Sequence, residues 1–133
     1  MYTQLADLLQ AAYEDAQTGV IILTGGPACF TSGNDLVDFL QHPPTHLDAP
    51  AFHLMKVVTR LQKPLIAAVE GYCVAGGTEI LQATEIRVAG ESSQLGIAEV
   101  RRGLFPLGGS TVRLQRQIPF TIAADLLLTG RLI

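Results

Sequence analysis

The chain has 133 residues, of which 48% are hydrophobic and 16% charged, and this composition predicts one folded domain with a substantial core. The net charge of −3 and the absence of a cluster of basic and aromatic residues argue against nucleic-acid binding. No apolar run is long enough for a membrane span, so we expect no contact with a membrane. Cys29 and Cys73 have no neighbours that suggest a zinc site or a disulfide framework. They indicate buried thiols in a cytoplasmic protein.

The first half of the sequence alternates between helical and strand patterns. Leu5, Leu9 and Ala12 recur at helical spacing and predict a helix over residues 3–17, with Gly19 as its C-cap. Three short apolar runs are typical of parallel strands buried on both faces. We expect these strands at residues 19–24, 65–69 and 85–89, with helices at 51–62 and 77–83 between them. This order predicts an α/β fold with right-handed crossovers.

The remaining segments read as loops and two further helices. Residues 41–50 (QHPPTHLDAP) are rich in proline and aperiodic, and predict a mobile surface loop within the domain. After Gly90 we expect a loop up to Gly108, Gly109 and Ser110, which can cap a helix ending at residue 117. A last helix is expected over residues 119–128, starting at a proline.

Two glycine-containing segments, residues 24–36 (TGGPACFTSGNDL) and 70–80 (EGYCVAGGTEI), combine a strand end with a turn or a helix start. In each, a backbone N–H beside a glycine lacks a partner within the chain and can point at a ligand oxygen. Two such groups facing each other form an oxyanion hole, which stabilises charge that develops on a carbonyl oxygen. The alternative is that these glycines only form turns. Neither segment matches a phosphate-binding loop or a dinucleotide fingerprint.

The segments VIILTGGPACFTSGNDL and KPLIAAVEGYCVAGGTEI, in this order and spacing, resemble the two signature segments of the enoyl-CoA hydratase/isomerase (crotonase) superfamily. LGIAEVRRGLFPLGGSTVRL and LLLTGRLI resemble the segments that follow in that family. The resemblance implies a crotonase-like spiral of β-β-α units. It also implies that residues 1–133 form a partial core domain, without the family's first strand and its C-terminal helical region. In the family that region builds a trimer, usually paired into a hexamer, and the resemblance to the family implies a homo-oligomer.

The resemblance also implies a binding site for an acyl-CoA thioester. In the family, two backbone N–H groups hold the thioester carbonyl, and the matching positions here are Ser32 and Gly76. Ser32, Gly33, Asn34 and Asp35 would form the loop along which the thioester end of coenzyme A lies. The thioester is the substrate, so no separate cofactor and no metal ion are expected.

Two carboxylates match the family's catalytic positions, Glu79 and Glu99. Hydration of a double bond needs a base to activate water at Cβ and an acid to protonate Cα. We assign the first task to Glu79 and the second to Glu99, since neighbouring carboxyl groups favour unequal protonation. Taken alone, Glu79 would be a solvated acid at a helix start. Glu99 would be a surface partner of Arg101 or Arg102.

The hypothesis is therefore an enoyl-CoA hydratase. An enoyl-CoA isomerase or another crotonase-family enzyme that works with a single acid is one alternative, and a catalytically silent subunit is another. A metal site at His42, His46 and His53 is disfavoured because no acid stands at a suitable spacing. A serine hydrolase based on Ser32 or Ser110 lacks the motif of an exposed nucleophile.

Overall fold

Two parallel β-sheets form in the part of the chain that the computed structural model describes, which is residues 1–43, 46 and 49–133. Sheet A has the order β1-β3-β5 and sheet B the order β2-β4-β6, so the chain passes alternately from one sheet to the other. Every pairing within the two sheets is parallel, as predicted. The strands of sheet A are β1 (Ile21–Thr24), β3 (Leu65–Val69) and β5 (Ile86–Ala89). Those of sheet B are β2 (Cys29–Thr31), β4 (Tyr72–Val74) and β6 (Gln94–Gly96).

The helices lie mainly where the sequence predicts them. They are α1 (Tyr2–Glu14), α2 (Leu36–Gln41), α3 (Pro50–Arg60), α4 (Gly76–Leu81), α5 (Ser110–Gln117) and α6 (Phe120–Thr129), with a 3₁₀ helix η1 (Glu99–Arg102). Sheet B, α2 and η1 are additions to the prediction. Their short lengths explain this, because three to six residues carry too little periodicity to be recognised.

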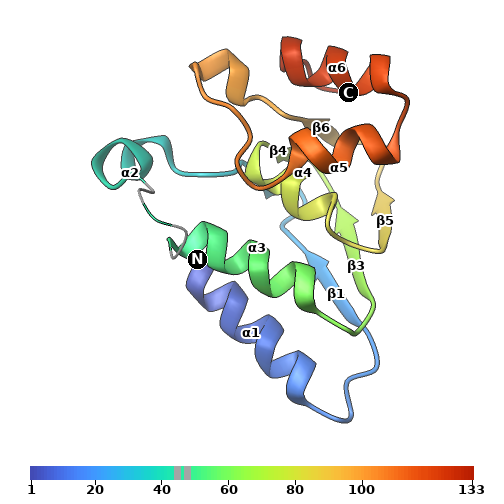
Figure 1. Ribbon diagram of the computed structural model, residues 1–133. Helices are drawn as coiled ribbons and strands as arrows, with labels where there is room; N and C mark the ends of the chain where they lie inside the picture. The colour runs from blue at the N-terminus through green and yellow to red at the C-terminus, as the bar shows by residue number, and fades with distance from the viewer. Residues whose placement is uncertain (44–45, 47–48) are drawn as a thin grey trace.

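The largest core cluster lies between sheet A and the helices α1 and α3, which run side by side against one face of the sheet (Figure 1). Burying each large side chain of this kind contributes roughly 1.5–3 kcal/mol. Helix α4 joins the cluster through Ile80, so the helix that carries Glu79 is fixed directly to the core. The buried members are Ala6, Leu9, Leu54, Val58, Leu65 and Ile80.

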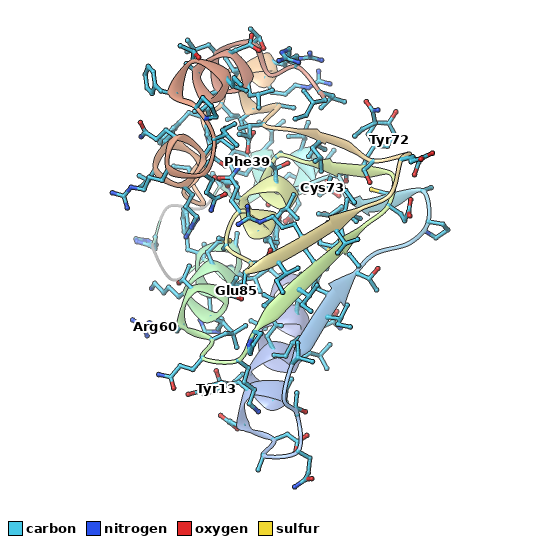
Figure 2. The ribbon with its side chains drawn as sticks, turned by 90° about the vertical axis from the view of Figure 1, so that its right-hand side faces the viewer. Tyr13, Phe39, Arg60, Tyr72, Cys73 and Glu85 are labelled. Carbon is cyan, nitrogen blue, oxygen red and sulfur yellow. The ribbon has the colours of Figure 1, made fainter. Side chains whose placement is uncertain are left out.

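The other face of sheet A is apolar and exposed, which corrects the prediction that its strands are buried on both faces. Ile22, Ile86 and Val88 are 62%, 51% and 59% exposed. The register places Ile22, Ile66 and Ile86 in one row across the sheet. No helix of the described residues covers this face (Figure 2). Apolar strand sequences thus indicated the sheet but not the number of its covered faces.

Two chain connections also differ from the prediction or extend it. Helix α1 ends at Glu14 and not near Gly19, because the Asp15 carboxylate accepts hydrogen bonds from the Gln17 N–H and the Thr18 hydroxyl and forms a turn there. The proline-rich loop is flanked by α2 and α3. Residues 44–45 and 47–48 lie outside the described residues, and the mobility of this loop stays a prediction.

Ala75, between β4 and α4, has an unfavourable backbone conformation. Its φ of +53° and ψ of −124° make it the one residue other than glycine with positive φ among the residues described. A side chain makes this region costly, by roughly 1–3 kcal/mol. This turn at Ala75 lets α4 begin at Gly76, with one residue between it and the end of β4.

We expect Ala75→Gly to raise the free energy of unfolding by about 1 kcal/mol, because relief of strain exceeds the added flexibility of the unfolded chain. Urea unfolding measures the change. The control is Ala11→Gly in the exposed part of α1, which should lower stability by roughly 0.5–1 kcal/mol. An Ala75→Gly variant that loses stability like the control would contradict the strain argument.

Candidate active site

A cavity of about 240 Å³ lies between α1, α3, α4 and residues 99–108. Its wall is mainly apolar, and four polar side chains face it, from segments far apart in the sequence. These are Tyr2, Asn34, Glu79 and Glu99. Much of the apolar wall comes from Phe39, Phe52, Met55, Leu104 and Phe105. A pocket of this kind suits a largely apolar ligand that also meets a few fixed polar groups.

Glu79 lies in the first turn of α4 and is only 5% exposed, so it is not a solvated surface acid. Both of its carboxylate oxygens accept backbone hydrogen bonds. The Gly108 N–H donates to Oε2 over 2.8 Å and the Ser110 N–H donates to Oε1 over 3.1 Å. Bonds to a charged acceptor are stronger than neutral ones and fix the carboxylate in place. Each carboxylate oxygen has a further lone pair that can accept another hydrogen bond.

Residues 108–110, which donate to Glu79, are held in place by two further side chains. The buried Gln82 side chain donates from Nε2 to the Ser110 hydroxyl over 3.0 Å, and Arg113 donates from Nη1 to the Gly108 carbonyl over 2.5 Å. A Cβ atom at Gly108 would overlap the Glu79 carboxylate. Ser110 is fully buried, which rules it out as an accessible nucleophile.

Glu99 begins the 3₁₀ helix η1 and is partly buried at the same cavity. Burial, and to a smaller extent the charge of Glu79, raise the pKa of Glu99 to about 7 from its ordinary value of 4.5. Its Oε2 atom is buried without a hydrogen-bond partner among the described residues. Among the described residues, no ion pair joins Glu99 to Arg101 or Arg102. Glu99 is therefore not the surface partner of these arginines that the sequence alone would suggest.

Residues 32–35 approach the start of α4. A Cβ atom added to Gly33 would lie 3.3 Å from the Gly76 nitrogen and 2.9 Å from Cβ of Ala75, so only a glycine fits there without displacement. Within the described residues, neither the Ser32 N–H nor the Gly76 N–H donates a hydrogen bond to the protein. The structure thus brings together two segments that each carry an unused donor.

The four residues of this loop differ in their relation to the cavity. Asn34 lines the cavity, while Ser32, Gly33 and Asp35 do not. The Asp35 carboxylate accepts hydrogen bonds from the N–H groups of Val37 and Asp38 and caps α2. The Asp35 side chain thus fixes the start of α2, and its expected place along coenzyme A stays a prediction.

Sequence reasoning did not find three contributors to the site. Tyr2 faces the cavity from the first turn of α1, and the N–H groups of Gly108 and Ser110 hold Glu79. The adjacent glycines at 108 and 109 were a signal, but they predicted only a helix cap. The described residues contain no group of three or more His, Cys, Asp or Glu arranged to hold a metal ion. No helix among them has the length and apolarity to cross a membrane.

Comparison with known proteins decides the family. The sequence model of the enoyl-CoA hydratase/isomerase family matches residues 1–133. The chain belongs to the enoyl-CoA hydratase/isomerase family. Enoyl-CoA hydratase EchA19 of Mycobacterium tuberculosis is 54% identical over 121 residues, which cover 83% of this chain and 44% of that protein. The 2,3-dehydroadipyl-CoA hydratase of Escherichia coli is 33% identical, over 98% of this chain and 51% of that enzyme.

Solved structures of the family share the fold. Pseudomonas aeruginosa OdaA matches with a TM-score of 0.94 and 39% identity, over all of this chain and 54% of its own. Enoyl-CoA hydratase EchA1 of Mycobacterium marinum matches with a TM-score of 0.86 and 42% identity, over 98% of this chain and 51% of its own. The expected crotonase-like α/β fold is confirmed, and the chain spans about half the length of these relatives.

The raised pKa of Glu99 gives stability a definite dependence on pH. Between pH 4.5 and about 7 the folded chain binds more protons at Glu99 than the unfolded chain does. The stability that comes from this proton binding is therefore lost as pH rises through this window. Glu99→Gln keeps a neutral side chain at all pH values. We expect it to raise the free energy of unfolding at pH 8 by roughly 1 kcal/mol, a value discounted because the side chain is partly exposed.

Urea unfolding at several pH values between 4.5 and 8 measures this effect. Glu91→Gln, which removes an exposed carboxylate outside the cavity, is the control, and its curve should run parallel to that of the unmodified chain. If the free energy of unfolding of the unmodified chain and of Glu99→Gln depended equally on pH, the raised pKa of Glu99 would be contradicted.

Proposed function

We propose that this chain adds water to the double bond of a 2-enoyl-CoA thioester. The proposal rests on one observation, which is that Glu79 and Glu99 face the same cavity as Gly76. Two carboxyl groups and a backbone donor are the groups that hydration next to a carbonyl needs. Relatives named as enoyl-CoA hydratases support this reading at the level of the family.

The proposed oxyanion hole consists of the N–H groups of Ser32 and Gly76. When water attacks Cβ, the electrons of the double bond move toward the thioester, and negative charge develops on the carbonyl oxygen. Donors that are fixed before the reaction stabilise this charge, and the loss of one such donor typically costs about 3–4 kcal/mol. The unused N–H groups of these two residues and the missing Cβ of Gly33 between their segments support the assignment.

The two glutamates would divide the proton transfers. Glu79 takes a proton from water while the water oxygen bonds to Cβ, and Glu99 gives its proton to Cα, so that H and OH add to the same face of the double bond. With a pKa of about 7, a large fraction of Glu99 carries this proton at neutral pH. After the addition Glu79 is protonated and Glu99 ionised. Transfer of one proton from Glu79 to Glu99 restores the starting state.

The apolar cavity wall fits the acyl part of such a substrate, with Phe39, Phe52 and Phe105 around it. Coenzyme A would enter only as part of the thioester, so the proposed reaction uses no other cofactor. The homo-oligomer and the cytoplasmic location expected from the sequence stay predictions.

Crotonyl-CoA hydration tests the proposal, followed through the loss of the conjugated enoyl thioester absorbance. We expect the chain to turn over this substrate and both Glu79→Gln and Glu99→Gln to reduce kcat at least about a hundredfold, because each removes one proton-transfer group. Circular dichroism of both variants controls for folding.

A folded chain that binds crotonyl-CoA without hydrating it would contradict the proposal. Conversion of a 3-enoyl-CoA to the conjugated 2-enoyl-CoA by the same chain would then indicate an isomerase. Absence of any acyl-CoA binding would favour the silent subunit.

A further inference from the structure

Tyr2, the first residue of α1, forms a hydrogen bond at the wall of the cavity, and the proposed reaction does not use this bond. Its hydroxyl donates to Oδ1 of Asn34, in the middle of residues 32–35. Both side chains line the cavity, together with Gly76 and Glu79. The contact joins segments that are 32 positions apart in the sequence.

The side chain of Tyr2 is held in place by the hydrophobic core. Its ring packs against the core cluster between α1, α3 and sheet A. Burial, and secondarily the charge of Glu79, raise the pKa of Tyr2 above its ordinary value of 10.0. The hydroxyl therefore keeps its proton at neutral pH and remains a hydrogen-bond donor.

Apart from the close approach of Gly33 to the start of α4, residues 32–35 have few other restraints. Gly33 donates its N–H to the hydroxyl of Thr31 over 3.2 Å, and Asp35 caps α2, but both bonds are local in the sequence. Among the described residues, Tyr2 is the hydrogen-bond partner that ties the side chain of Asn34 to a distant element.

The same hydroxyl also lies beside the second segment of the proposed oxyanion hole. Its oxygen is 3.8 Å from the position of a Cβ atom built on Gly76. Tyr2 is therefore hydrogen-bonded to the loop that follows Ser32 and lies near the turn that contains Gly76. The Tyr2 side chain and Ile80 of α4 pack in the same core cluster, so the bond to Asn34 is anchored to the core that also holds the helix starting at Gly76.

We propose that Tyr2 is a positioning residue that sets the separation of the Ser32 and Gly76 N–H groups through its hydrogen bond to Asn34. This inference rests on the proposed function, because it concerns the carbonyl oxygen that these groups would bind. Small errors in the placement of such groups reduce the rate of the chemical step far more than they weaken binding.

Tyr2→Phe removes the hydroxyl and keeps the ring that packs on the core. We expect kcat for crotonyl-CoA to fall about tenfold, with KM changed less than about twofold. The matched control is Tyr13→Phe on the same helix, whose hydroxyl donates to Gln62 over 3.2 Å. Tyr13 lies far from the cavity residue Phe39 (Figure 2), and its variant should keep the unmodified kcat. A Tyr2→Phe variant that behaves like the control would overturn the inference.

The route through Asn34 is tested by a double-mutant cycle. If Tyr2 acts through Asn34, Tyr2→Phe should cost almost nothing further in an Asn34→Ala background. Additive losses would overturn this route and indicate direct contact between the hydroxyl and the substrate.

A substrate-free measurement separates this inference from the proposed function. Backbone ¹⁵N relaxation of residues 32–34 should give lower order parameters in Tyr2→Phe and not in Tyr13→Phe. If the unmodified chain does not hydrate crotonyl-CoA, the proposed function fails while this measurement still decides whether Tyr2 restrains the loop. Unchanged order parameters in Tyr2→Phe would overturn the positioning role whatever the activity.

Discussion

The site depends on the two hydrogen bonds that Gly108 and Ser110 donate to the Glu79 carboxylate. They tie the first turn of α4 to the start of α5, and so fix the wall formed by residues 99–108 against the helix that carries the acid. The bonds require an approach that a side chain at Gly108 would prevent. Gln82 and Arg113 hold the donating segment in turn, so the acid is oriented by a connected network and not by a single contact.

The environments of the two glutamates are unequal, and in the proposed reaction this difference separates the base from the acid. Glu79 has backbone donors on both oxygens, whereas Glu99 has a buried oxygen without a partner among the described residues and a pKa raised to about 7. Leaving a buried polar atom unpaired costs stability. Such a cost is typical of groups that are poised for reaction, where activity and stability conflict.

The sequence predicted the parts of the fold that carry strong periodicity or a matching motif. Strand β3 and helices α3, α5 and α6 were found within two residues, and Glu79, Glu99, Gly76 and Asn34 were placed at one site that the structure assembles as a cavity. Sheet B was missed because its strands have three residues each. The exposed face of sheet A and the Tyr2–Asn34 contact depend on tertiary neighbours, which no local pattern records.

The central claim is that Glu99 gains and loses a proton near neutral pH in the cavity that it shares with Glu79. NMR titration of side-chain carboxyl carbons in a ¹³C-glutamate-labelled chain tests this claim most directly. The account predicts one resonance with a midpoint near pH 7, absent in Glu99→Gln and shifted to lower pH in Glu79→Gln, where the repelling charge is gone. A titration in which every glutamate resonance has its midpoint near the ordinary value of 4.5 would contradict it.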